Sequence, residues 1–312
     1  MIIWVKDFGR TKGGELVSLY TLENSKRTRV QAINYGAAVV SAVVPKRDES
    51  FVDIVLGYDD IGSYENQKSR IGAVVGRAAN RVKNGEVVLD ATKYALTAND
   101  GADHELGGAE GFDKKIWSAE VLDGALVMSC VSPDGDEGYP GTLQASVKYY
   151  LDDDDAFTVS YEAQTDKTTL CNMSNRLFFN LDGHDSDAIN DQRIAIDVGS
   201  LISLNDGLSL TGGLSDFKTL NIAEPQDGSV KKVACAYSPA SGVELIISSN
   251  MPGVSLYDGL DIEDSSVGKN GAVYNKRGGF CLAPQYLSLD QCVLTSDKTY
   301  KSEIVYHFSV IK

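Results

Sequence analysis

The sequence predicts an all-β protein, and three observations indicate this class. Apolar and polar residues alternate with a period of two over many short segments, as in strands with one buried face. Turn residues recur between those segments, at Asp134-Gly135-Asp136, Ser241-Gly242, Asp258-Gly259 and Asn270-Gly271. No segment sustains a helical period with caps at both ends. Many short strands at regular spacing are typical of a large sandwich or barrel.

The clearest single element is a hairpin in the middle of the chain. Residues 143–151 alternate, an acidic run follows at 152–155, and residues 157–163 alternate again. This pattern predicts two paired strands with one face in the core. The acidic run lacks the glycine and terminal glutamate of a calcium loop, so it is interpreted as a solvated turn.

The other predicted elements are shorter. Alternation predicts further strands over residues 30–34, 38–44, 125–131, 243–248 and 303–310. Residues 59–64 and 72–79 are each expected to hold a helical turn. The chain shows no internal repeat and no linker rich in Pro, Gly and Ser, so residues 1–312 are expected to form one domain.

Length and composition describe a globular chain. The 312 residues suffice for a large core, and the hydrophobic fraction of 43% is ordinary. No apolar run reaches the roughly 20 residues of a membrane helix, and the N-terminal residues become charged too early for a signal peptide. The five cysteines lie far apart, which favours a reducing cytoplasm over a disulfide framework. We expect no metal and no cofactor.

The formal net charge of −15 limits the choice of partners. A strongly acidic surface repels phosphate backbones, so nucleic acid is not an expected partner. The simplest interpretation of this net charge is that it keeps the protein soluble. Among the three histidines, His184 and His307 match no metal-ligand spacing and are interpreted as structural.

Several motifs occur in the order found in the galactose mutarotase (aldose 1-epimerase) family. The chain resembles that family from about Phe8 to Val310, most weakly between residues 212 and 232. The motifs are Asn34-Tyr35-Gly36-Ala37, Gly76-Arg77-Ala78-Ala79-Asn80-Arg81, Gly111-Phe112-Asp113-Lys114, Gly135-Asp136-Glu137-Gly138-Tyr139-Pro140-Gly141 and Phe280-Cys281-Leu282-Ala283-Pro284-Gln285. The resemblance implies a galactose mutarotase-like β-supersandwich, a large twisted antiparallel sandwich with a sugar cleft on one face.

The resemblance also implies an acid–base reaction that this chain lacks the residues to perform. Family members open and reclose a sugar hemiacetal with a Glu base, a His acid and a second, helping His. The positions that match these groups hold Ala283, Arg176 and Leu106. A methyl group takes no proton, a guanidinium is a poor acid at neutral pH, and a leucine side chain forms no hydrogen bond.

Other ligand-contacting positions of the family are only partly kept. Asn80 and Arg81 match, although Arg81 has the alternative of pairing with a structural carboxylate. Ser255 replaces a sugar-binding Gln, and Asp258 stands where the family usually has Thr. His104 is a second-choice replacement for the helping His and otherwise lies on the cleft rim. The family's Asp has no match in the shortened segment before Val233, where Glu224 and Asp227 are loosely placed.

Three functions follow as alternatives. The first is a pseudoenzyme of the mutarotase-like family that binds a carbohydrate or another small molecule, sugar-like or anionic, or a protein partner. The second is a repurposed isomerase or cyclase that uses Arg176, Asp258, His104 or tyrosine residues. The third is residual aldose 1-epimerase activity, that is, hexose mutarotation through substitute residues.

Overall fold

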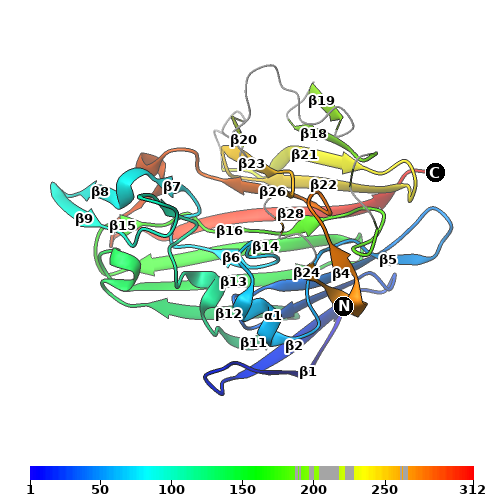
Figure 1. Ribbon diagram of the computed structural model, residues 1–312, viewed down its shortest axis with the longest axis horizontal. Coiled ribbons are helices and arrows are strands. Elements are labelled where there is room, and N and C mark those ends of the chain that lie inside the picture. Colours follow the sequence, from blue (N-terminus) through cyan, green and yellow to red (C-terminus); the bar gives the residue numbers. More distant parts are fainter. Residues whose placement is uncertain are drawn as a thin grey trace.

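The computed structural model describes residues 1–186, 189, 191–196, 200–203, 218–221, 228–260, 262 and 266–312. Its main element is a nine-stranded antiparallel sheet, whose strands lie side by side from β11 to β19 (Figure 1). In spatial order these are β11 (Ser118–Leu122), β12 (Ala125–Ser132), β13 (Leu143–Leu151), β14 (Ala156–Thr165), β28 (Tyr300–Val310), β22 (Val243–Ser249), β21 (Lys231–Tyr237), β18 (Arg193–Ile196) and β19 (Ser200–Ser203). The all-β prediction is confirmed.

Two further sheets complete the sandwich. A four-stranded sheet has the order β17 (Phe178–Phe179), β26 (Phe280–Gln285), β23 (Gly253–Tyr257) and β20 (Lys218–Asn221). A five-stranded sheet follows the chain through β1 (Ile2–Arg10), β2 (Leu16–Glu23), β3 (Arg29–Ile33), β4 (Val39–Pro45) and β5 (Phe51–Asp53). The main apolar core takes side chains from all three sheets, among them Val30, Met128, Val254, Leu282 and Ile304.

Short elements connect the sheets. The paired strands are β6 (Val74–Val75) with β16 (Ser174–Asn175), β7 (Arg81–Val82) with β10 (His104–Glu105), β8 (Glu86–Leu89) with β9 (Thr92–Ala95), β15 (Thr169–Leu170) with β27 (Val293–Leu294), and β24 (Ser266–Val267) with β25 (Val273–Tyr274). The helical pieces are α1 (Ile61–Asn66) and single 3₁₀ turns at Lys83–Gly85, Phe112–Lys114, Asp136–Gly138, Lys269–Gly271 and Leu289–Cys292. None of the helices in the described ranges is long and apolar enough to span a membrane.

The predicted hairpin is confirmed, and the structure gives its register. In β13 and β14, Leu143 pairs with Thr165 and Leu151 pairs with Phe157. The acidic run between them forms the turn, because the Asp152 carboxylate accepts hydrogen bonds from the backbone N–H groups of Asp154 and Ala156.

The two expected helical turns have different outcomes. The first exists as α1, where the Asp60 carboxylate caps the N-terminus by accepting from the Ser63 N–H at 2.9 Å. The second is wrong, because residues 72–79 contain the strand β6 and a parallel bridge between Ala78 and Asn172. There the backbone N–H of Ala79 donates to the Asn172 carbonyl instead of closing a helical turn. The organisation as one domain stays a prediction.

Candidate functional site

Strand pairing brings Ser255 and Ala283 directly opposite each other. They are register partners in β23 and β26, with Tyr257 facing Cys281 and Gly253 facing Gln285 on either side. Val254, Leu256 and Leu282 point into the main core. Because side chains alternate along a strand, the side chains of Ser255, Tyr257, Ala283 and Gln285 point to the other face. On that face the Gln285 side-chain amide donates to the Ser255 hydroxyl oxygen. Both Ser255 and Ala283 are buried.

Arg176 reaches the same face from the segment between β16 and β17. Its guanidinium carbon lies 4.2 Å from the centroid of the Tyr257 ring and 5.2 Å from that of Phe178. Its Nε donates to the Ser69 carbonyl at 2.8 Å, and only 2% of the residue is exposed. Aromatic faces attract a guanidinium by about 0.5–2 kcal/mol each. We call Arg176, Ser255, Tyr257, Ala283 and Gln285 the Arg176 cluster.

Leu106 lies at the edge of the same region. It has a φ of +52° just after β10, and its side chain packs against Val75 and Ala79. Val75 pairs with Ser174, two residues before Arg176. Arg70 ties these segments together, because its Nη2 donates to the Gly108 carbonyl at 2.7 Å and its Nε to the Asp113 carboxylate at 3.2 Å.

The sequence reasoning missed Arg70, Tyr257 and Ser69. Arg70 contacts the loop after Leu106, and the other two hold the Arg176 guanidinium. Ser69 and Arg70 are adjacent in the chain and Tyr257 lies far from them, so only the tertiary structure brings all three to this region. The order of motifs alone pointed to the region.

The side chains of Asn80 and Arg81 contact neighbouring segments of the chain. The Asn80 amide donates to the Tyr286 carbonyl at 2.9 Å and accepts from the Asn172 amide. The Arg81 guanidinium lies 2.5 Å from the Asp100 carboxylate, 3.1 Å from Asp103 and 3.3 Å from Glu105. These ion pairs favour the alternative in which Arg81 pairs with structural carboxylates.

His104 does not lie on the rim of a cleft, so the expectation of a rim position is wrong. The residue lies in β10 opposite Val82 and is fully buried. Its Nδ1 is 2.8 Å from the Thr97 carbonyl and its Nε2 is 2.6 Å from the Tyr139 hydroxyl, so both ring nitrogens have partners. Burial lowers the pKa of the ring, so His104 is neutral at pH 7. These contacts make His104 a structural residue.

Asp258 directly follows β23, and its side chain contacts the loop after it and Arg277. Its Oδ1 accepts from the Leu260 N–H at 3.2 Å and its Oδ2 is 3.6 Å from Nη2 of Arg277. Glu224 and Asp227 lie outside the described residues.

The two remaining histidines each have a hydrogen-bond partner. Nδ1 of His184 is 3.2 Å from the Tyr274 hydroxyl, and the His184 backbone N–H donates to the backbone carbonyl of Asp53. Nε2 of His307 is 3.1 Å from the Asp154 carbonyl at the hairpin turn. Within the described ranges, no three His, Cys, Asp or Glu side chains are grouped so that they could hold a metal ion.

The fold and the site region define a class of protein, the sandwich proteins with a mutarotase-like arrangement of sheets. The structure superposes on that of an aldose epimerase homologue from C. elegans with a TM-score of 0.83, at 24% identity over 94% of this chain and 98% of that one. It superposes on a galactose 1-epimerase from Lactobacillus acidophilus with a TM-score of 0.80, at 22% identity over 100% and 99% of the two chains. At such identities the likeness shows the fold.

The sequence comparisons then place the chain in a family. The family model for aldose 1-epimerase matches residues 18–307. Bovine galactose mutarotase is 34% identical over 297 residues, which cover 88% of this chain and 86% of that protein. Aldose 1-epimerase from Escherichia coli is 35% identical over 218 residues, covering 67% and 62% of the two chains. The chain belongs to the aldose 1-epimerase family, and the predicted resemblance is confirmed.

Proposed function

We propose that this chain is a non-catalytic member of the aldose 1-epimerase family. In this proposal it binds a carbohydrate or another small molecule in the ancestral sugar cleft. The observation that carries the proposal is the identity of three residues. Leu106, Arg176 and Ala283 stand where the resemblance places the helping His, the acid and the base.

The surroundings of these positions support the loss of proton transfer. Ala283 faces Ser255 across two strands, and the Ser255 hydroxyl oxygen accepts a hydrogen bond from the Gln285 amide. The Arg176 guanidinium, packed against Tyr257 and Phe178, keeps its proton at neutral pH. A reacting sugar would therefore meet a fixed cation and a hydroxyl here.

The histidines of the chain offer no replacement acid. There are three, and each has hydrogen-bond contacts elsewhere: His104 with Tyr139, His184 with Tyr274, and His307 with the Asp154 carbonyl. Positioned acid–base groups contribute roughly 10²–10⁴-fold each to a rate. The loss of base, acid and helper together is expected to leave mutarotation near its spontaneous rate.

The ligand class follows from the family and from Arg176. Relatives are named galactose mutarotase and aldose 1-epimerase, so a sugar-like ligand is the first choice. A buried arginine in place of a histidine favours a ligand with a negative charge, such as a sugar acid or sugar phosphate. A cytoplasmic location and a protein partner at the same surface are further parts of the proposal.

Polarimetry and thermal shift together test the proposal. We expect galactose mutarotation at the spontaneous rate, and a larger rise in Tm with glucuronate or galactose 1-phosphate than with galactose. The Arg176→Met variant should lose that difference, whereas Arg277→Met, which changes an arginine paired with Asp258, should keep it. Enzymatic acceleration of galactose mutarotation would overturn the non-catalytic assignment. A shift equal or larger with galactose would overturn the anionic preference.

A further inference from the structure

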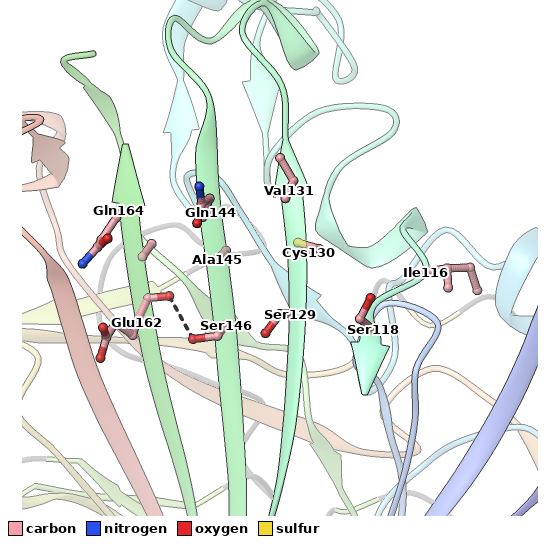
Figure 2. Close-up of a pocket in the computed structure, with 11 residues that line it drawn as sticks. Ile116, Ser118, Ser129, Cys130, Val131, Gln144, Ala145, Ser146, Glu162 and Gln164 are labelled. Atoms are coloured by element: carbon pink, nitrogen blue, oxygen red, sulfur yellow. Dashed lines mark hydrogen bonds between the residues drawn. The ribbon is translucent and has the colours of Figure 1, made fainter. Parts of the chain in front are cut away.

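The solvent-facing side of the nine-stranded sheet carries a hollow with a regular floor. A pocket of about 440 Å³ lies over β11, β12, β13 and β14, as Figure 2 shows. Its floor is one row of register partners: Ser118 faces Ser129, Ser129 faces Ser146, and Ser146 faces Glu162. Three neighbouring serines in one row leave space that longer side chains would fill.

Larger side chains border this row. Val131, Gln144 and Gln164 form the next row on one side, and Ile116 lies at the end near β11 (Figure 2). A second hollow of about 470 Å³ adjoins the first, since both are lined by Ser146 and Glu162. We call the floor row and its border residues the serine groove. Its size is within the range of small-molecule sites, about 300–1,000 Å³.

The lining of the serine groove favours a neutral polar ligand. Its 440 Å³ part is lined by serine hydroxyls, two glutamine amides and one carboxylate, and none of these described lining residues is basic. An anion would meet Glu162 and the net charge of −15. Hydroxyls and amides both donate and accept hydrogen bonds, which matches a ligand rich in hydroxyl groups. Ile116 and Val131 offer apolar contacts to its C–H groups.

The serine groove is separate from the Arg176 cluster. Residues that alternate with the groove row, such as Met128 and Val147, point into the main core. Val254 and Leu282 enter that core from the other sheet, opposite the face that holds Ser255 and Ala283. A ligand in the groove therefore makes no contact with the Arg176 cluster.

We propose that the serine groove binds a neutral oligosaccharide of two or three sugar rings, lying across the strands. Adjacent strands are about 4.8 Å apart, so the row from Ser118 to Glu162 spans roughly 14 Å. Along it the sugar hydroxyls meet the Ser118, Ser129 and Ser146 hydroxyls, and Gln144 and Gln164 bind from one side. The Glu162 carboxylate, 3.3 Å from the Lys301 ammonium, accepts from a hydroxyl at the end of the row.

Calorimetric titration of the full chain with cellotriose, maltotriose and chitotriose tests the proposal, with trigalacturonate as the anionic probe. We expect at least one neutral trisaccharide to bind and trigalacturonate not to bind. Ser146→Trp should abolish binding by filling the groove, and Gln144→Ala should weaken it about tenfold, or about 1.4 kcal/mol. Ser248→Trp, on the partly exposed face of β22 in the same sheet, is the matched control and should leave binding unchanged.

The outcomes of these titrations distinguish binding in the serine groove from binding at the Arg176 cluster. Binding that persists in Ser146→Trp and Gln144→Ala but is lost in Arg176→Met would overturn the groove assignment and favour the ancestral cleft. Absence of binding by all three neutral trisaccharides would overturn the proposal. Thermal melts of each variant identify any loss that comes from unfolding, and Gln144→Ala, an exposed surface change, keeps the test valid if Ser146→Trp does not fold.

Discussion

The guanidinium carbon of Arg176 lies 4.2 Å from the centroid of the Tyr257 ring. Tyr257 is two residues from Ser255 on the same face of β23, and Ser255 is the register partner of Ala283. A positive charge, an aromatic ring, a hydroxyl and a methyl group thus occupy the region where the resemblance implies a carboxylate base and an imidazole acid. The substitutions form a packed arrangement, because Arg176 is held by Tyr257, Phe178 and the Ser69 carbonyl together.

Restoring the base alone should not restore mutarotation. In Ala283→Glu, the new carboxylate would enter a buried site that still lacks the acid and the helping histidine. We expect polarimetry with galactose to give the spontaneous rate, within error, for this variant. The triple variant Leu106→His/Arg176→His/Ala283→Glu is the comparison, and each positioned group is worth roughly 10²–10⁴-fold. Acceleration by Ala283→Glu alone would contradict the coordinated loss.

Removing the Lys269 ammonium should strongly destabilise the fold. Its Nζ lies 2.5 Å from the Asp53 carboxylate and donates to the Val40 and Val55 carbonyls at 2.8 and 2.7 Å. Lys269→Met leaves a largely buried carboxylate without its cation, which typically costs about 3–5 kcal/mol. Urea unfolding measures this loss. Lys298→Met, at an exposed lysine, is the control and should stay within about 0.5 kcal/mol of the parent chain.

Stability should decrease as the pH falls through the histidine range. Burial lowers the pKa of His104, and burial together with the nearby Lys269 ammonium lowers that of His184. An unfolded histidine takes up its proton near pH 6.5, so between that pH and the lower folded pKa values the unfolded chain binds more protons. The stabilisation that the two neutral histidines contribute to the free energy of unfolding is therefore complete above about pH 6.5 and is lost as the pH falls below it.

Urea unfolding at a series of pH values from about 7.5 to 5.5 checks this sign. The free energy of unfolding should fall more steeply with decreasing pH in the parent chain than in His104→Gln/His184→Gln. Acidic groups contribute equally to both chains, so the difference between the slopes reports the two histidines. Equal slopes would show that neither histidine is linked to folding.

Cysteine labelling should distinguish one residue from the other four. Cys130, Cys171, Cys281 and Cys292 are buried, and Cys235 is partly exposed in β21. Burial raises the pKa of the Cys130 and Cys292 thiols to about 12, which leaves almost no reactive thiolate near pH 8. We expect iodoacetamide to label Cys235 first in the native protein, and all five only after denaturation. Rapid native labelling of Cys292, identified by mass spectrometry, would contradict the packing around β27.

The sequence by itself determined the class of the fold and the residues at the family's reactive positions. Alternation over residues 143–151 and 157–163 predicts a hairpin with one buried face. The pairing of Val147 with Tyr161 buries both side chains, and a slip of one residue would turn one of them to solvent. Motif order then predicted that Leu106, Arg176 and Ala283 stand at the family's reactive positions. These conclusions depend on local pattern and on residue identity, both of which are written in the chain.

Tertiary structure alone decided what those residues contact. Residues 72–79 carry a pattern that permits a helical turn, yet β6 pairs with β16, a hundred residues away, since that pairing satisfies its backbone groups. His104 is buried rather than on a cleft rim, because its ring contacts the Thr97 carbonyl and the Tyr139 hydroxyl. The serine groove exists only because four strands align Ser118, Ser129, Ser146 and Glu162 in register. Long-range contacts of this kind depend on how distant segments pack, which no local period encodes.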